Sequence, residues 1–375
     1  MGILSWVILA AWILALGRTI LNLVLIPRLR RERPAALPRV SVIVPARNEE
    51  RTIEQTVRAL LAQRWEALEV IVVDDRSTDA TGSILDAIAA EDARLRPLRG
   101  DEPPAGWLGK PWALHQGSRV ARGELFLFVD ADVQYEPEAL PAAVARFERS
   151  GVAMLSLFPR IVMQSFWEHI AMSNLAVVAF TFMPLWLGNR TRIPLLGIGG
   201  GPGNLVDRLA YERSGGHEAL RDAVVDDVAL ARLLRRKGHR TEVALASELV
   251  SIRMYHGLRE IVDGFTKNVF AAFNRSYAVT TFFLLAGILT HGVPYGMAIA
   301  GDGVALATLL IIVLSRLVLF SALRYRLDSA LLGHPLMMLT WGWILMRSVW
   351  FTGVRKELHW RGRRYDAEET RFGAD

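Results

Sequence analysis

The sequence predicts an α/β fold: a doubly wound, Rossmann-like sheet domain with membrane-spanning helices at both ends of the chain. Three observations support this prediction. Short apolar runs alternate with helical patterns over residues 40–158. Long runs with almost no charge occupy residues 3–26 and much of 279–352. Hydrophobic residues make up 52% of the 375 residues, which is high for a water-soluble domain alone. Alternation of strands and helices is typical of a mostly parallel sheet that is covered on both faces.

Residues 1–27 are predicted to form a transmembrane helix. Residues 3–26 carry one formal charge, on Arg18, and a run of this length spans the hydrocarbon core as a helix. A cleaved signal peptide is the alternative, but no basic region precedes the run and no small-residue cleavage site follows it. Five arginines lie in the linker of residues 28–39. By the positive-inside rule, the N-terminus is then outside and the next domain is cytoplasmic, at the cell (inner) membrane.

Residues 40–278 are predicted to form this cytoplasmic domain. The expected strands cover residues 40–44, 69–73, 124–129 and 152–158, and the expected helices cover residues 50–63, 79–92, 110–121 and 137–149. The strands are continuous Val, Ile, Leu and Phe runs, as in parallel strands that are buried on both faces. Ligands of such sheets bind at the carboxyl ends of the strands.

Two apolar stretches within this domain are interrupted by polar residues, near 161–188 and near 256–276. Apolar residues recur at helical spacing in the second stretch, with Arg259 and Lys267 among them. We expect both stretches to form helices that lie in the membrane interface. Ordinary packing in the protein core is the alternative.

The C-terminal part of the chain is predicted to hold transmembrane or re-entrant helices over residues 279–352. The runs 279–300, 303–323 and 329–352 are each long enough to span a bilayer. Gly333, His334 and Pro335 interrupt the last run, which favours a broken or re-entrant helix there. The basic tail of residues 353–375 favours the cytoplasmic side. The sequence leaves the number of crossings open.

Charge and cysteine content exclude several classes of function. The net charge of +6 comes largely from basic residues beside the apolar runs, which suits an anionic membrane surface and disfavours nucleic-acid binding. The chain has no cysteine, so disulfides and thiolate metal sites are excluded. The histidines show no zinc-like spacing.

Acidic residues stand at three separate places that an α/β fold brings together. Asp75 follows the second expected strand, Asp130-Ala131-Asp132 follows the third, and Asp226-Asp227 precedes a helical pattern. Carboxylates at i and i+2 on a loop hold one hard cation, and that cation holds a diphosphate. We therefore expect Mg²⁺ or Mn²⁺ at Asp132, with Gln134 as a further oxygen ligand. The arrangement suggests sugar transfer from a nucleotide-sugar, with Asp130 on the nucleotide.

Two further charged positions have both a chemical and a structural interpretation. Asp227 is the candidate general base, because a hydroxyl acceptor must lose its proton as it attacks the anomeric carbon. Acids at the start of a helix also interact well with the helix dipole, which is the alternative for Asp226 and Asp227. Lys110 is expected near phosphate or near the base, and a surface lysine at a helix start is its alternative.

Three more segments contain candidate site residues. Pro45, Arg47 and Glu49 end the first expected strand, where Arg47 and Glu49 face one pocket unless Asn48 simply caps a helix. Asp226 and His217 are expected to meet the donor sugar or the acceptor, and a loop histidine without such a contact is the alternative for His217. The glycine-dense residues 197–203 do not spell a dinucleotide fingerprint, so we expect a flexible loop over the acceptor pocket.

Three of these motifs together resemble family 2 glycosyltransferases of the GT-A fold. They are Ser41-Val42-Ile43-Val44-Pro45-Ala46-Arg47-Asn48-Glu49, Val72-Val73-Asp74-Asp75-Arg76-Ser77-Thr78-Asp79 and Val129-Asp130-Ala131-Asp132. The resemblance covers about residues 38–275 and implies an inverting transfer from a UDP- or GDP-sugar. It implies metal at Asp132, a base at Asp227, and nucleotide contacts at Pro45, Arg47, Glu49, Asp75 and at Asp130 with its neighbour Ala131. The similar run in polyprenyl-phosphate mannosyltransferases supports Gln134 as a metal ligand.

Other segments resemble the branch of this family that glycosylates membrane lipids, including carotenoid (hydroxychlorobactene and diaponeurosporenoate) glycosyltransferases and ceramide glucosyltransferases. These segments are residues 106–110, 214–218 and 360–365. The QxxRW motif of the ceramide and polysaccharide enzymes is absent from the comparable stretch, residues 253–257. Processive polysaccharide synthesis is therefore not expected.

The resulting prediction is a membrane-integral enzyme that moves one sugar, glucose from UDP-glucose, onto a hydroxyl of a lipid acceptor. A carotenoid is the first choice of acceptor. A ceramide, a diacylglycerol or a polyprenyl phosphate is the alternative within the same class. A non-catalytic scaffold that binds nucleotide-sugars is the alternative from a different class.

Overall fold

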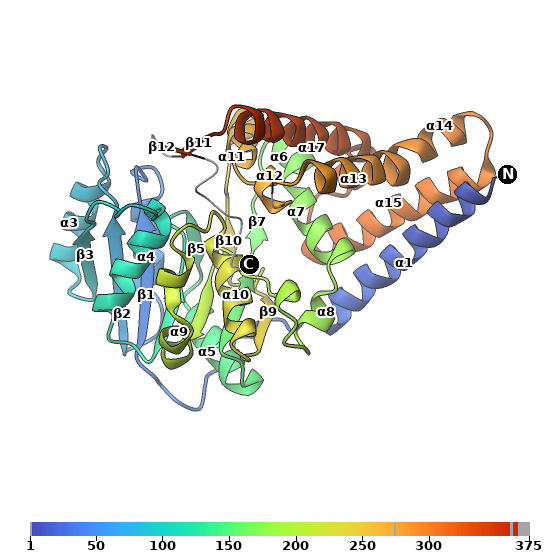
Figure 1. The fold of residues 1–375 in the computed structure, drawn as a ribbon. Helices are drawn as coiled ribbons and strands as arrows, with labels where there is room; N and C mark the ends of the chain where they lie inside the picture. Colours follow the sequence, from blue (N-terminus) through green and yellow to red (C-terminus); the bar gives the residue numbers. More distant parts are fainter. Residues whose placement is uncertain (1, 274, 361–362, 367–375) are drawn as a thin grey trace.

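A seven-stranded mixed sheet lies at the centre of the larger lobe of the computed structural model, which describes residues 2–273, 275–360 and 363–366 (Figure 1). The strand order is β3-β2-β1-β4-β8-β6-β9. The strands are β1 (Val40–Ala46), β2 (Leu68–Asp74), β3 (Leu95–Arg99), β4 (Leu125–Phe128), β6 (Met154–Phe158), β8 (Asn204–Asp207) and β9 (Thr241–Leu245). Strand β8 runs antiparallel to β4 and β6, and the other neighbours pair in parallel.

Helices cover both faces of this sheet, so the predicted doubly wound α/β fold is confirmed. One face carries α2 (Ile53–Leu61), α3 (Thr81–Glu91) and α5 (Ala139–Ser150), and the other carries α4 (Gly109–Val120), α9 (Arg208–Ser214) and α10 (Asp226–Arg236). Side chains of consecutive β1 residues point to opposite faces of the sheet. Val42 and Val44 pack under the first set of helices, and Ile43 packs under the second. Burial on both faces explains why the strands are apolar throughout.

The structure also contains strands that the sequence analysis did not identify. They are β3, β8 and β9 of the large sheet and a small sheet of order β5-β10-β7, formed by β5 (Val133–Tyr135), β10 (Val250–Ile252) and β7 (Arg160–Ile161). In the small sheet, Ile252 lies opposite Val133. This pairing brings the segment after β10 beside Asp132, although the two are far apart in the sequence.

Three helices among the described residues are long and apolar enough to cross a membrane. They are α1 (Ile3–Leu25), the continuous helix Tyr277–Ile299 and α15 (Gly303–Leu323). The helix Tyr277–Ile299 is formed by α13 (Tyr277–Gly287), a π-helical turn (Ile288–Gly292) and α14 (Val293–Ile299). Helices α1 and α15 lie side by side and extend away from the sheet (Figure 1).

The last predicted run is a broken helix, as Gly333 and Pro335 suggested. It consists of α16 (Leu327–Leu332), α17 (His334–Ser348) and a π-helical turn (Val349–Val354). Helix α17 lies against the helices next to the sheet domain rather than apart from them (Figure 1). The Trp341 indole donates to the Ala171 carbonyl at 2.9 Å, and the Ser348 hydroxyl donates to the Thr266 carbonyl at 2.5 Å.

Short helices form a layer between the sheet domain and the long helices. Those of the 161–188 stretch are α6 (Phe166–Ala171), α7 (Ser173–Val177), the π-helical turn Val178–Phe182 and α8 (Leu185–Gly188). Those of the 256–276 stretch are α11 (Gly257–Thr266) and α12 (Val269–Ala272). Their apolar residues share one buried cluster with α15 and α17. The packing alternative therefore describes their inner faces, and their place at the membrane interface stays a prediction.

The basic tail is described only in part. Strands β11 (Glu357–Trp360) and β12 (Arg363–Asp366) pair antiparallel. Residues 361–362 of the 360–365 motif and the end of the predicted tail, residues 367–375, lie outside the described residues.

Candidate active site

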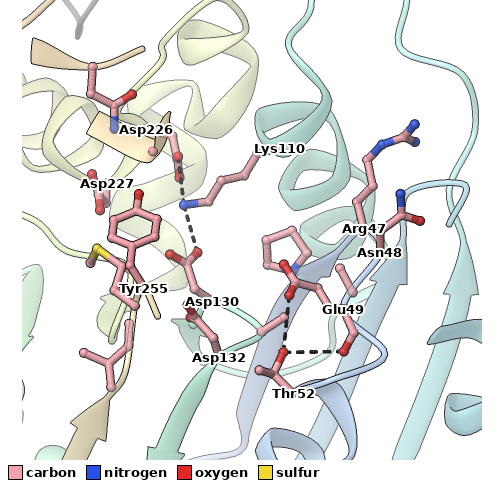
Figure 2. A pocket seen from close by; sticks show the side chains of 18 of the residues that line it. Arg47, Asn48, Glu49, Thr52, Lys110, Asp130, Asp132, Asp226, Asp227 and Tyr255 are labelled. Carbon is pink, nitrogen blue, oxygen red and sulfur yellow. Dashed lines mark hydrogen bonds and ion pairs between the residues drawn. The ribbon is translucent and has the colours of Figure 1, made fainter. Parts of the chain in front are cut away.

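A cavity of about 590 Å³ opens at the carboxyl ends of β1, β2 and β4 (Figure 2). Ten of the predicted site residues line it, although they come from five separate segments of the chain. They are Pro45, Arg47, Glu49, Asp75, Lys110, Asp130, Ala131, Asp132, Asp226 and Asp227. The carboxyl end of a doubly wound sheet is where ligands bind in this class of fold.

The loop after β1 is held by hydrogen bonds to the loop after β2. Asn48 has a left-handed backbone, with φ of 53°, and its side-chain oxygen accepts the Thr78 N–H at 2.8 Å. The Arg47 guanidinium donates to the Asp75 carbonyl at 2.5 Å. Helix α2 begins only at Ile53. Asn48 is therefore not a helix cap: it ties the two loops that bring Arg47, Glu49 and Asp75 to the cavity.

Lys110 joins the carboxylates on the two sides of the cavity. Its ammonium lies 2.8 Å from Asp130 Oδ1 and 3.1 Å from Asp226 Oδ1 (Figure 2). Burial alone would lower the pKa of Lys110, but the negative charges of Asp130, Asp226 and Asp227 outweigh it and raise that pKa well above its ordinary value. Lys110 does stand at the start of helix α4 (Gly109–Val120), as the alternative has it, but its ammonium pairs with carboxylates of the cavity.

Asp226 and Asp227 form the first turn of α10 and also line the cavity. Burial raises the pKa of Asp226 to about 6, against the opposing effect of Lys110. Burial also raises the pKa of Asp227, and hydrogen bonds from the Val228 and Gly201 N–H groups oppose that shift. A carboxylate with a raised pKa is a better proton acceptor, and a general base works best when its pKa lies near the working pH.

The glycine-dense residues 197–203 are packed tightly against this site, contrary to the flexible loop that was expected. The Gly201 carbonyl accepts the Asp130 N–H at 2.8 Å. A Cβ at Gly201 would overlap the Asp130 carboxylate, and a Cβ at Gly199 would overlap the Asp227 carbonyl. Only glycine allows such close backbone approach. The segment thus sets the positions of Asp130 and Asp227, a role that sequence reasoning missed.

Two predicted residues do not line the cavity. Gln134 lies on β5, two residues after Asp132, and is half-buried. His217 is buried behind Asp226, with its Nε2 4.0 Å from Asp226 Oδ2. Its Nδ1 lies 2.7 Å from the Tyr211 hydroxyl, and burial lowers its pKa to about 3. The His217 ring therefore supports the wall behind Asp226 instead of facing the cavity.

A second wall of the cavity was not recognised in the sequence. It is formed by Ile252 at the end of β10, by the loop of residues 253–256, and by one stripe of α11 with its end. The stripe consists of Glu260, Asp263, Gly264, Lys267 and Asn268. This spacing places the stripe on one helix face, while Ile261, Val262 and Phe265 on the other face pack in the layer toward α15 and α17. We call residues 252–268 the acceptor wall, after the role that is proposed for them below. Its buried face packs with α15 and α17, which we call the membrane-side helices after the topology proposed below.

The cavity carries more negative than positive groups and suits a hard cation. Eight carboxylates line it against five basic side chains. The basic side chains are Arg47, Arg51, Lys110, Arg253 and Lys267. Within the described residues, no three carboxylate, histidine or thiolate side chains cluster closely enough to hold a metal on their own. Mg²⁺ characteristically takes one or two carboxylates plus substrate phosphates and water, so the donor set fits a metal that arrives with a diphosphate.

A comparison with protein families identifies the domain around this cavity. The model of glycosyl transferase family 2 matches residues 41–207. The chain carries a family 2 glycosyltransferase domain. The matched residues contain the loop after β1, Asp75, Lys110, Asp130 and Asp132, and the predicted family is confirmed.

Relatives of this glycosyltransferase include 4,4'-diaponeurosporenoate glycosyltransferases. The enzyme of Staphylococcus haemolyticus is 28% identical over 236 residues, which are 61% of this chain and 60% of that enzyme. The enzyme of Staphylococcus aureus strain MRSA252 is 25% identical over 338 residues, 87% of this chain and 88% of that enzyme. The family 2 domain and these relatives together support a glycosyltransferase of the hexosyltransferase type, and the chain is similar to carotenoid glycosyltransferases.

A solved structure shares the fold. The mannosyltransferase from Pyrobaculum calidifontis, solved with GDP-Man and Mn²⁺, aligns over 94% of this chain and 99% of its own with a TM-score of 0.53 at 19% identity. This similarity confirms the GT-A-like architecture of the family 2 domain.

Proposed function

We propose that the enzyme transfers one glucose from UDP-glucose to a hydroxyl of a membrane lipid, with inversion at the anomeric carbon. One observation carries this proposal: Asp227 lines the same cavity as Asp130 and Asp132, and the acceptor wall that lines it too packs onto the membrane-side helices. The nucleotide-sugar then enters from water at the sheet, and the lipid arrives from the helical side. A carotenoid is the first choice of acceptor, because the relatives above are named for one. Their named substrate carries a carboxylate, so the choice of a hydroxyl rests on the cavity of this enzyme and not on the relatives.

The donor side is assigned from the cavity lining. Pro45, Arg47, Glu49 and Asp75 take the nucleotide, together with Asp130 and Ala131. Asp132 holds Mg²⁺ or Mn²⁺, with Gln134 as a further ligand that must turn toward the ion from its place on β5. The ion, when bound, neutralises the charge that develops on the departing diphosphate. The mannosyltransferase with the shared fold was solved with GDP-Man and Mn²⁺, which supports a nucleotide-sugar and a divalent metal.

Asp227 is assigned as the general base. It takes the proton from the acceptor hydroxyl while the oxygen forms its bond to the anomeric carbon and the bond to the diphosphate breaks on the opposite face. Two facts favour a hydroxyl over an ionised acceptor. The raised pKa of Asp227 suits proton removal, and the excess of carboxylates in the cavity disfavours an anion.

The membrane arrangement is part of the proposal. Three crossings by α1, Tyr277–Ile299 and α15 return the chain to the side of the sheet domain, where Arg324 lies 3.4 Å from Glu248. Segment α16–α17 then stays on that side, because Arg347 of α17 pairs with Asp263 of the acceptor wall at 2.8 Å. A cytoplasmic domain and a cytoplasmic tail both follow, which fits the charge distribution of the sequence.

The absence of cysteine makes this topology easy to test. Three exposed residues are replaced by cysteine, one at a time. Ala300 lies between two spans, Lys237 lies in the sheet domain, and Val354 lies at the end of the α16–α17 segment. In intact cells, an impermeant maleimide should label only Ala300→Cys. Labelling of Val354→Cys from outside would show that the α16–α17 segment crosses the membrane.

The function itself is tested by a lipid-extract assay. Purified enzyme in detergent, Mn²⁺ and radiolabelled UDP-glucose are incubated with total membrane lipids of the organism that makes the protein, beside an Asp132→Ala control. We expect a labelled organic-phase product with wild-type enzyme and none with the control, and the product's mass identifies the acceptor. Product with another nucleotide-sugar in place of UDP-glucose would overturn the donor assignment alone. Absence of product with every donor would contradict the proposal.

A further inference from the structure

A buried carboxylate lies outside the cavity, in the layer between the sheet domain and the membrane-side helices. Glu168 of α6 is 1% exposed. One oxygen accepts the Ser165 hydroxyl at 2.9 Å and the Gly257 N–H at 3.0 Å, and the other accepts the Gln164 N–H at 2.8 Å. The Arg253 guanidinium donates to both oxygens, at 3.1 and 3.2 Å.

These hydrogen bonds join α6 to both ends of a short segment of the acceptor wall. Arg253 and the three residues after it line the cavity. Gly257, with φ of +78°, begins α11, and α11 presents its polar stripe to the same cavity. Glu168 thus holds the side chain at one end of this segment and the backbone at the other.

Glu168 differs from an ordinary buried ion pair because its partners Arg253 and Gly257 belong to the acceptor wall. Burial of a carboxylate is costly unless it is fully hydrogen-bonded, and buried ion pairs often give no more stability than apolar residues of similar size. Burial would raise the pKa of Glu168, but the bonds from Arg253, Gln164, Ser165 and Gly257 lower it to about 2. The group is therefore ionised at any working pH and acts as a fixed anchor.

We propose that Glu168 is the positioning residue of the acceptor wall: it fixes Arg253 and the start of α11 so that the acceptor oxygen reaches Asp227 and the donor sugar together. The inference rests on the proposed function. Glu168 touches neither donor nor acceptor, and its effect is expected on acceptor use and not on nucleotide binding. A disordered acceptor wall admits water in place of the lipid.

The test compares Glu168→Gln with a matched control, Glu242→Gln. Glu242 of β9 is also buried and accepts two bonds from one arginine, Arg146, both at 2.7 Å. Neither residue lines the cavity. Three quantities are measured in the full-length enzyme: the KM for the lipid acceptor, the affinity for UDP with Mn²⁺, and the ratio of sugar released to water to sugar transferred to lipid.

For E168Q we expect the acceptor KM to rise about tenfold to a hundredfold, from the loss of charge-assisted hydrogen bonds. The share of sugar lost to water should rise as well, with UDP affinity unchanged. E242Q should change neither acceptor KM nor that share. Glu168→Asp keeps the charge but shortens the side chain, so its acceptor KM should change in the same direction by a smaller factor. This variant replaces E168Q in the test if E168Q does not fold.

Two failures are distinguishable. Equal behaviour of the Glu168 variants and E242Q, beside a wild-type enzyme that transfers sugar to lipid, would overturn the role of Glu168 alone. A wild-type enzyme that transfers sugar to no lipid would overturn the proposed function, and the inference with it.

Discussion

The two sides of the cavity are built in different ways. The donor side consists of loops at the carboxyl ends of β1, β2 and β4, and backbone pairing of these strands brings Arg47, Asp75 and Asp130 together. The acceptor wall comes from the last residue of the short strand β10, the loop after it and helix α11, and side chains such as Glu168 hold it to its surroundings. Side-chain contacts are more readily exchanged in evolution than a sheet. This construction lets one donor site serve different acceptors.

The largest effect that would test this division is expected from Asp227→Asn. The amide keeps the shape of the side chain but takes up no proton, so transfer to a hydroxyl should fall by about 10²–10⁴-fold. Binding of UDP with Mn²⁺ should persist, because the donor side is intact. The measurement is kcat for lipid glucosylation beside a UDP-binding isotherm. Full activity of this variant would contradict proton removal from a hydroxyl and would indicate an acceptor that is already ionised, such as a carboxylate or a phosphate.

A smaller loss is expected from Gly201→Ala, which acts on the donor side through the backbone. The added Cβ would overlap the Asp130 carboxylate, so this side chain must move, and a displacement near 1 Å at a reacting site costs about 10²-fold. We expect weaker donor binding and a higher KM for UDP-glucose.

Gly200→Ala is the matched control for Gly201→Ala. A Cβ at Gly200 would meet only Pro202 Cδ, at an ordinary 3.4 Å. We expect wild-type kinetics from this variant. Equal losses in both variants would mean that the segment is sensitive as a whole and that the contact with Asp130 is not special.

The mildest effect concerns pH and involves Lys110, which contacts Asp130 on the donor side and Asp226 in the first turn of α10. Transfer needs ionised carboxylates, and burial raises the pKa of Asp226 to about 6 and also raises that of Asp227. Activity should therefore fall as the pH drops through 6. In Lys110→Met the cation that opposes these shifts is gone, so the acidic limb of the kcat profile should move to higher pH. An unmoved limb would show that neither carboxylate controls it.

The sign of the stability effect separates this loss from unfolding. A carboxyl group whose pKa is higher in the folded than in the unfolded chain binds its proton more tightly when folded. For Asp226, the free energy of unfolding therefore rises as the pH falls from about 6 toward the ordinary pKa of 3.8. If activity declines below pH 6 while this contribution to stability increases, the loss of activity comes from protonation of the carboxylates and not from unfolding.

The donor side could be predicted from the sequence because its signals are local. Asp75 and Asp130 directly follow apolar strands, and parallel strands end at one edge of a sheet. The tight packing of residues 197–203 had a local signal as well: Gly197, Gly199, Gly201 and Gly203 alternate, and a Cβ at each would crowd a neighbouring atom. We interpreted glycine density as flexibility, whereas close approach was the physical reason.

The acceptor wall could not be predicted in the same way. Glu168 meets Arg253 and Gly257 across 85 and 89 residues, and no local pattern specifies such a pairing. The contact arises because β10 pairs with β5 and β7, strands of three residues or fewer that carry almost no periodicity. The helical stripe from Glu260 to Asn268 was visible in the sequence, but the side that it faces depends on that pairing.

Lys110 has a further consequence for the order of events. One ammonium lies between Asp130, where the nucleotide is proposed to bind, and Asp226, beside the proposed base. Binding couplings are reciprocal, so any charge that arrives at Asp130 changes the proton affinity at α10, and protonation there changes donor affinity by the same factor. With the proposed roles of Asp130 and Asp227, we expect Lys110 to couple donor binding to the protonation of the carboxylates on α10, in both directions. Departure of UDP would reset both at once.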